Sequence, residues 1–375
     1  MSSFSAYKKQ MEQVRKLGEC LEGGEFIESP FDLPVEEESR GDPDQRDDDQ
    51  NFSKERNLCL SLEPDLTGAK YDIKSVEYPP RLLYFLDGSL RTKYLGEYLE
   101  GQRCFPILSS EVSCAVVKKV GGSLEKHRIA KKLSFIFPHK DSGLISDTKF
   151  EKMRELDNLW GNDSFLRIEF LLKTDLEASD VRTSMLAKAR DIMHNLEHKV
   201  AENLDRGEDW LVMDGAIRKG EFLRLENVIG LAKSFSRKPI FDLGDGKPLM
   251  IATYLSRVRE GERSAVFKKE SGENVAFWYV RIRTYPPMEP LGGLVKVDLK
   301  LAEDELSNDM IQKINEISAE IYAFRSPSIY PYPRWPSFIY PIRLCEMIIR
   351  STYMNNEIKG YFGRELKKAI GREVS

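Results

Sequence analysis

Two apolar runs in the sequence each end in an Asp-Gly pair. Residues 82–88 read LLYFLDG and residues 210–215 read WLVMDG, so Asp87 and Asp214 both follow stretches typical of short buried strands. Glycine lets the backbone turn sharply after such a strand, and the aspartate then projects its carboxylate from the sheet edge. If the two strands lie side by side, Asp87 and Asp214 come within a few ångströms of each other.

Two carboxylates that close together raise each other's pKa, and a divalent cation relieves the conflict. Two hard cations about 4 Å apart, held by Asp and Glu oxygens, are a general device for phosphodiester hydrolysis. An Asp-Gly pair is also a common turn after a strand, and this reading stays open for each pair taken alone. Basic residues follow both pairs, namely Arg91 and Lys93 after the first and Arg218 and Lys219 after the second. The repetition of the whole pattern, in which an apolar run, an Asp-Gly pair and basic residues follow one another, favours a functional site.

The separation of the two pairs also fits adjacent strands. The interval of 214 − 87 = 127 residues leaves room for three hairpinned strands and a helix before the second strand returns beside the first. We expect an antiparallel meander that begins at Asp87, with a turn at Ser109 and Ser110. The further predicted elements are helices at 147–160 and 178–204, a strand at 209–215, a helix at 220–234, strands at 274–287 and 292–301, and helices at 303–324 and 342–370.

The N-terminal part of the chain differs in composition from the rest. A charged helix is predicted at 4–22, and residues 34–57 are acidic and poor in aromatics, which is typical of a linker or long loop. We therefore divide the chain into an N-terminal helix and linker, 1–57, and a domain that carries both Asp-Gly pairs, 58–375. The fold class expected from these elements is α/β, with an N-terminal helical extension.

Composition excludes several classes of protein. The 375 residues are 41% hydrophobic, which is enough for a sizeable core, and the formal charge of −4 provides no overall attraction to nucleic acid, so any such binding needs a local patch. Five scattered cysteines without CxxC spacing fit reduced thiols. No run of 18 apolar residues and no signal peptide is evident, so we expect a cytoplasmic protein without membrane contact. A Walker A sequence is absent, so energy from ATP would have to come from a partner.

Four short motifs together resemble the NurA family of archaeal and bacterial nucleases. They are LDGSL at 86–90, MDGAI at 213–217, GLAKS at 230–234, and a Tyr-Pro-rich segment before the last helix, and the resemblance extends over about residues 80–360. It implies an RNase H-like mixed sheet flanked by helices and a homodimer that encloses a DNA channel. The implied activity is manganese-dependent cleavage of single- and double-stranded DNA, by 5′-to-3′ exonuclease and endonuclease action. The implied partner is a HerA-like hexameric ATPase, in DNA end processing or phage defence.

The resemblance also assigns roles to individual residues. Asp87 corresponds to the family's first metal ligand and Asp214 to a later one, for Mn²⁺ or Mg²⁺ and for two ions in all. The family supplies a further Glu from the intervening helix, for which Glu197 and Glu202 are candidates. We favour Glu197, because 214 − 197 = 17 residues fits the family's separation and because it flanks the apolar stripe of the helix. A solvated flank residue is the alternative for Glu197.

The last ligand position departs from the family pattern. NurA proteins carry a His near the start of the last helix, and this chain has no His after His198. Matching YPIRLCEMII, residues 340–349, to the pattern places Glu346 at that position, and we predict that it replaces the His as a ligand. Lys233 in GLAKS matches the family's Lys and could face the scissile phosphate. Alternatively, Lys233 caps the C-terminal end of a helix.

Several other residues are candidates for contact with nucleic acid. Arg91 and Lys93 follow the first Asp-Gly pair, while Arg281 and Arg283 share one face of a predicted strand and could contact phosphates or simply face solvent. Four aromatic residues near the last helix could stack on unpaired bases or pack a rigid loop, namely Tyr330, Tyr332, Trp335 and Tyr340. Two alternative functions remain open: a nuclease-inactive DNA-binding or scaffold subunit of a HerA-like complex, and an RNase H-like or Argonaute-like enzyme acting on RNA or hybrids.

Overall fold

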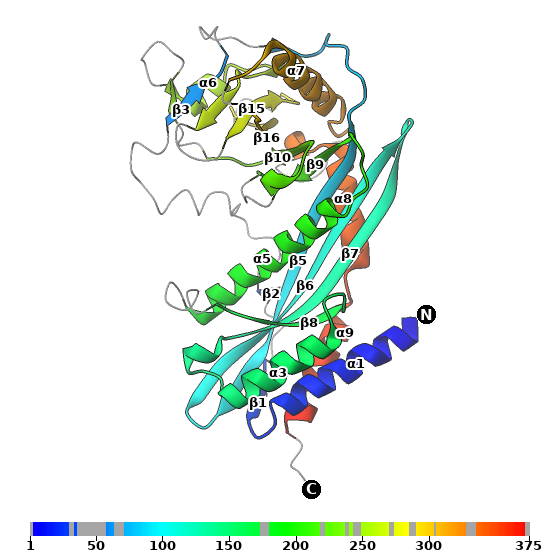
Figure 1. Cartoon of the computed structure of the whole chain (residues 1–375), viewed down its shortest axis with the longest axis vertical. Coiled ribbons are helices and arrows are strands. Elements are labelled where there is room, and N and C mark those ends of the chain that lie inside the picture. The colour runs from blue at the N-terminus through cyan, green and yellow to red at the C-terminus, as the bar shows by residue number, and fades with distance from the viewer. Residues whose placement is uncertain are drawn as a thin grey trace.

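A mixed β-sheet of sixteen strands runs through the molecule in this computed structural model (Figure 1). The description covers residues 3–29, 34–35, 58–63, 71–172, 180–217, 222–236, 240–242, 249–269, 274–284, 290–303, 305–327 and 335–371. Within these ranges, no helix is long and apolar enough to span a bilayer.

Five adjacent strands of the sheet position the candidate site. An antiparallel meander consists of β5 (Leu82–Glu100), β6 (Arg103–Val120) and β7 (Ser123–Phe137). On the other side of β5, β9 (Trp210–Asp214) pairs in parallel, and β10 (Val228–Ala232) pairs in parallel with β9. The resulting order β7-β6-β5-β9-β10, with β6 alone antiparallel to its neighbours, is that of an RNase H-like sheet. The expected α/β fold class is therefore confirmed.

Helices cover both faces of these five strands. The 22-residue helix α5 (Val181–Glu202) packs on one face, where its Leu196 and Val200 join a core with Leu86 of β5. On the opposite face, α7 (Asn308–Ala323) and α8 (Tyr340–Thr352) contribute to a second core that includes Phe85. Neighbouring residues of β5 thus point to opposite faces, as the two-residue period of a strand requires.

Further strands extend the sheet on both sides. Beyond β7 lies β8 (Leu166–Phe170), and beyond β10 the sheet continues with β16 (Leu294–Lys300) and β15 (Val275–Arg281). The remaining short strands and the helix next to them are β14 (Phe267–Lys269), β3 (Leu58–Ser61), β11 (Ile240–Asp242), β12 (Leu249–Met250), β13 (Glu262–Arg263), β4 (Tyr71–Asp72) and α6 (Ile251–Leu255).

The N-terminal helix packs at the end of the molecule far from β10 (Figure 1). It is confirmed as α1 (Ser3–Cys20) and contacts α9 (Asn356–Ile370) and α3 (Asp147–Trp160). The short strands β1 (Glu25–Glu28) and β2 (Pro34–Val35) pair with the second half of β5. Apart from β2, the predicted acidic linker lies outside the described residues.

Several predicted elements differ from those observed. The first strand does not end at Asp87, because β5 continues for another 13 residues, from Gly88 to Glu100. Ser109 and Ser110 form no turn, since both are buried within the continuous strand β6. The helix predicted at 220–234 is instead a short 3₁₀ turn followed by β10, all five residues of which are buried against neighbouring strands.

The last predicted helix is split into α8 and α9. Tyr353 is extended, with φ −63° and ψ 145°, and the buried carboxylate of Glu111 accepts a hydrogen bond from the Met354 N–H at 2.9 Å. This side-chain acceptor replaces the helical hydrogen bond that would have continued α8.

Candidate metal centre

Asp87 and Asp214 occupy adjacent positions at the end of the β5–β9 pairing. The last paired residues are Leu86 and Met213, so each aspartate is the next residue on its strand. Phe85 and Val212 both belong to the core beneath α8, and the two-residue period places the aspartates on the same face. After Asp214 the chain turns at Gly215, whose φ of 97° suits glycine, so the predicted turn is present on β9 but absent on β5.

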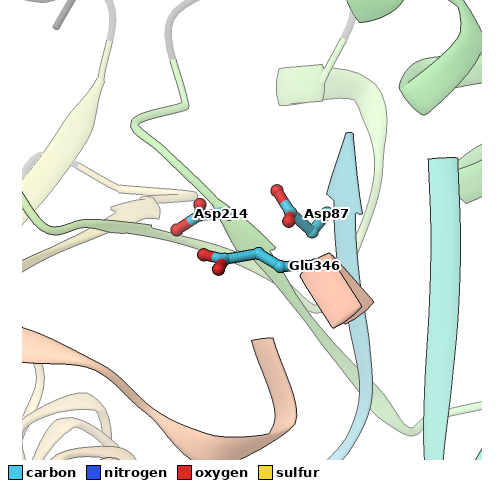
Figure 2. A group of neighbouring side chains, drawn as sticks. All are labelled: Asp87, Asp214 and Glu346. Carbon is cyan, nitrogen blue, oxygen red and sulfur yellow. The ribbon is translucent and has the colours of Figure 1, made fainter. Parts of the chain in front are cut away.

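Glu346 reaches the two aspartates from α8. One oxygen from each of Asp87, Asp214 and Glu346 lies within 4.8 Å of the others, and the three side chains converge from two strands and a helix (Figure 2). The buried Cys345 thiol beside Glu346 donates to the Phe85 carbonyl at 3.3 Å, which fixes α8 against β5 at this level. The predicted proximity of Asp87 and Asp214 is confirmed, and Glu346 joins them.

Two cationic side chains balance part of this negative charge. The Lys233 ammonium donates to Asp214 Oδ2 at 3.0 Å and to Glu346 Oε1 at 2.9 Å, and Arg343 donates to the other Glu346 oxygen. Lys233 follows β10 directly and not a helix, so the helix-capping explanation is wrong. The ring of Phe338 lies beneath both cations, 5.2 Å from Lys233 Nζ and 5.6 Å from Arg343 Cζ.

The surroundings of the cluster disfavour the charged forms of Asp87 and Asp214. Burial, followed by the nearby Asp214 carboxylate, raises the pKa of Asp87 well above its usual range, and burial also raises the pKa of Asp214. Burial alone would lower the pKa of Lys233, but the carboxylates of Asp214 and Glu346 raise it, so Lys233 is cationic. Burial raises the pKa of Glu346 as well, yet Lys233 and Arg343 outweigh it and leave that pKa below its usual value.

The donor set fits a hard divalent cation. All three converging atoms are carboxylate oxygens, which Mg²⁺ and Mn²⁺ prefer as ligands. Lys233 bonds Asp214 and Glu346, and Arg343 bonds Glu346, whereas Asp87 has no cationic side chain bonded to it among the described residues. A divalent ion among the three carboxylates would favour the charged forms of Asp87 and Asp214.

Glu197 lies close to the cluster but outside the three converging carboxylates. It is buried on α5, where its Oε2 accepts from His194 Nδ1 at 3.0 Å, and its carboxylate lies against Gly88. The other candidate, Glu202, is exposed at the end of α5. Of the two, the structure places Glu197 next to the strand that carries Asp87.

The candidate phosphate contacts have different surroundings. Arg91 and Lys93 lie on the same face of β5 as Asp87, and Arg91 stacks over Tyr353 at 4.1 Å from the ring centroid. Tyr340, at the start of α8, is 37% exposed. The cationic residues of β5 therefore continue along the strand from the carboxylate cluster.

Arg281 and Arg283 are engaged with the protein itself. The buried Arg281 guanidinium donates to the backbone carbonyls of Leu255, Val258, Pro290 and Gly292. These bonds use four of the five guanidinium N–H donors, and we assign Arg281 to fixing the surrounding loops.

Arg283 is held in a similar way. Its guanidinium donates to the Ser326 carbonyl and stacks over Trp335 at 5.3 Å from the ring centroid. Trp335 thus packs against protein, while Tyr330 and Tyr332 lie outside the described residues.

Sequence reasoning missed three residues that touch the cluster or its neighbours: Arg343, Phe338 and His194. The spacing of Arg343 to Glu346 and of His194 to Glu197 is three residues within a helix, which places each pair on one helix face. That spacing could have identified both pairs. Nothing in the sequence near Phe338 indicates that its ring supports two cations.

Comparison with known proteins adds little to this geometry. No family model matches the chain, and no curated protein matches it. The chain is similar in structure to the NurA nuclease from Sulfolobus solfataricus, with 14% sequence identity, and the match covers 79% of this chain and 88% of that chain. The TM-score is 0.34.

Proposed function

We propose that this protein is a divalent-metal-dependent nuclease that hydrolyses phosphodiester bonds in DNA. The observation that carries the proposal is the convergence of Asp87, Asp214 and Glu346 at one point of an RNase H-like sheet, with Lys233 among them. Buried carboxylates with raised pKa values and no sufficient internal partner are costly to the fold. Such an arrangement suggests that a cation completes it.

The residues of the cluster would divide the work between them. Asp87, Asp214 and Glu346, with Glu197 next to them, would hold Mn²⁺ or Mg²⁺, and we propose two ions when the DNA phosphate adds its own charge. The bound cation supplies activation of the attacking water and charge neutralisation at the phosphate. Lys233 is cationic at neutral pH, so it stabilises developing negative charge and does not act as a base.

We propose that the nucleic acid lies along the cationic side chains of β5 next to the cluster. Arg91 and Lys93 on β5 would bind phosphates on one side of the scissile bond, and the half-exposed Tyr340 could stack on an unpaired base. The proposal also includes cleavage of both single and double strands, exonuclease action in the 5′-to-3′ direction, a homodimer and a HerA-like ATPase partner. We further propose that the protein acts in the cytoplasm, in DNA end processing or phage defence.

Cleavage of end-labelled linear DNA tests the proposal. Purified protein is incubated with Mn²⁺, Mg²⁺ or EDTA, alone and with a HerA-like ATPase, and the wild type is compared with Asp87→Asn, Asp214→Asn and Glu346→Gln. We expect metal-dependent cleavage that falls by at least about a hundredfold in each variant, because each removes a ligand charge. Cleavage in EDTA, or variants that cut as fast as the wild type, would contradict it.

One observation favours a second candidate, a nuclease-inactive DNA-binding subunit. Lys233 already bonds two of the three carboxylates, and a lysine in that position can substitute for a metal ion. A protein of this class would bind DNA and show no cleavage under any condition of the same assay. Supplying RNA and RNA–DNA hybrids in parallel separates the third alternative, an enzyme that acts on those substrates.

A further inference from the structure

Gly88 is a glycine for a reason other than backbone conformation. It lies inside β5, opposite Cys114 of β6, and its φ is outside the left-handed region that favours glycine. Glycine in the interior of a strand weakens it relative to other residues and often marks a close approach by another group. The turn that Gly215 makes after Asp214 therefore has no counterpart at Gly88.

The space next to Gly88 is filled by one side chain. A Cβ at this position would lie 2.6 Å from Cδ and 2.8 Å from Cγ of Glu197, and closer still to Oε1. All three nearest atoms belong to Glu197, so the absent side chain is what lets the carboxylate settle against the strand. Glu197 comes from α5, on the face of the sheet opposite α8.

The second carboxylate oxygen is held from the other direction. His194, one helical turn before Glu197, places Nδ1 3.0 Å from Oε2. The Glu197 side chain is only 7% exposed, whereas His194 is 36% exposed, so the imidazole closes the solvent side of the carboxylate. Strand and imidazole together fix both oxygens of Glu197.

We propose that Gly88 and His194 are positioning residues that seat the Glu197 carboxylate beside Asp87, where it adds its charge to the cation site. This inference rests on the proposed function. Gly88 directly follows Asp87, so the Glu197 carboxylate that lies against Gly88 is next to a proposed ligand of the cation. Positioning residues of this kind influence the affinity of the site for its cation without being ligands themselves.

Substitution of Gly88 by alanine tests directly whether Gly88 positions Glu197. An alanine suits strand backbone, so Gly88→Ala leaves the fold intact and displaces only Glu197. We expect Mn²⁺ affinity, measured by electron paramagnetic resonance of free Mn²⁺, to fall by about tenfold or more. Gly122→Ala is the matched control, because Gly122 has open space where its Cβ would lie and no positive φ. It should bind Mn²⁺ as the wild type does, and the thermal midpoints of both variants should stay close to the wild type.

A double-mutant cycle separates action through Glu197 from a direct disturbance of Asp87. In a Glu197→Ala background, Gly88→Ala should cause no further loss of Mn²⁺ affinity, because the side chain that it displaces is gone. Losses that add in the double variant would overturn the inference. His194→Ala should also weaken binding, and His194→Asn, whose amide N–H can replace Nδ1–H, should restore most of it.

The outcomes distinguish this inference from the proposed function. If wild-type protein binds Mn²⁺ and cleaves DNA but Gly88→Ala binds Mn²⁺ equally well, the positioning role of Gly88 is refuted and the nuclease proposal stands. If the wild type binds no Mn²⁺, both are refuted.

Discussion

Replacement of Lys233 by methionine removes the cation from the centre of the carboxylate cluster. Methionine keeps most of the volume and the contact with Phe338, but Asp214 and Glu346 each lose an ion pair at 3.0 and 2.9 Å. At an effective dielectric constant of about 20, each pair attracts by about 5 kcal/mol before desolvation is subtracted. Loss of one partner from a buried pair costs about 3–5 kcal/mol in net stability.

The expected cost lies at the lower end of that range. The side chains of Asp214 and Glu346 are still 24% and 18% exposed, and Arg343 continues to bond Glu346, so we expect Lys233→Met to lose about 3 kcal/mol in EDTA. Mn²⁺ should restore about 2 kcal/mol of this, since it neutralises the same carboxylates. By linkage, this recovery means that the variant binds Mn²⁺ about 30-fold more tightly than the wild type.

Urea unfolding in EDTA and in saturating Mn²⁺ measures both quantities. Lys296→Met is the matched control, because Lys296 forms a comparable pair with the buried Asp298 at 2.8 Å outside the cluster. It should lose stability without recovery in Mn²⁺. A Lys233→Met protein that is as stable as the wild type in EDTA, or that gains no more from Mn²⁺ than the Lys296 control does, would refute the reasoning.

Three further predictions concern pH and the arginines. Because the folded protein raises the pKa values of Asp87 and Asp214, it retains protons that the unfolded chain has lost, so these groups should lower the stability of the metal-free protein as pH rises above about 4. Urea midpoints in EDTA should show a smaller loss with pH in Asp87→Asn than in the wild type. Arg281→Met should destabilise the fold by about 3 kcal/mol, because buried carbonyls lose a charged donor, yet leave DNA affinity unchanged in fluorescence anisotropy. Arg91→Gln should instead weaken DNA binding and reduce the slope of log affinity against log salt by about 0.9, and an unchanged slope would exclude a phosphate contact.

The sequence identified the site better than it identified the local structure around it. An apolar run before an Asp-Gly pair predicted two adjacent strands, and Asp87 and Asp214 do lie next to each other. The assumed reason was a turn at both glycines, and at Gly88 this reason was wrong. A strand that continues past its functional residue has the same local sequence as one that ends there, because the difference depends on pairing with β6 for another twelve residues.

Long-range contacts explain the remaining errors. Residues 228–232 were predicted as part of a helix, but their burial between β9 and β16 makes them a strand. Arg281 alternates with apolar residues as a surface residue would, yet carbonyls from segments both before and after its strand surround it. Neither fact can be read from the adjacent residues, since both depend on contacts with other segments of the chain.

Anomalous diffraction at the manganese edge, from crystals grown with Mn²⁺, tests the central claim most directly. We predict a strong peak bound by carboxylate oxygens of Asp87, Asp214 and Glu346, with the Lys233 ammonium moved away from at least one of them. Crystals of Asp87→Asn grown under the same conditions should lose the peak. A map without manganese at this cluster, and with Lys233 still bonded to Asp214 and Glu346, would contradict the assignment of a metal centre.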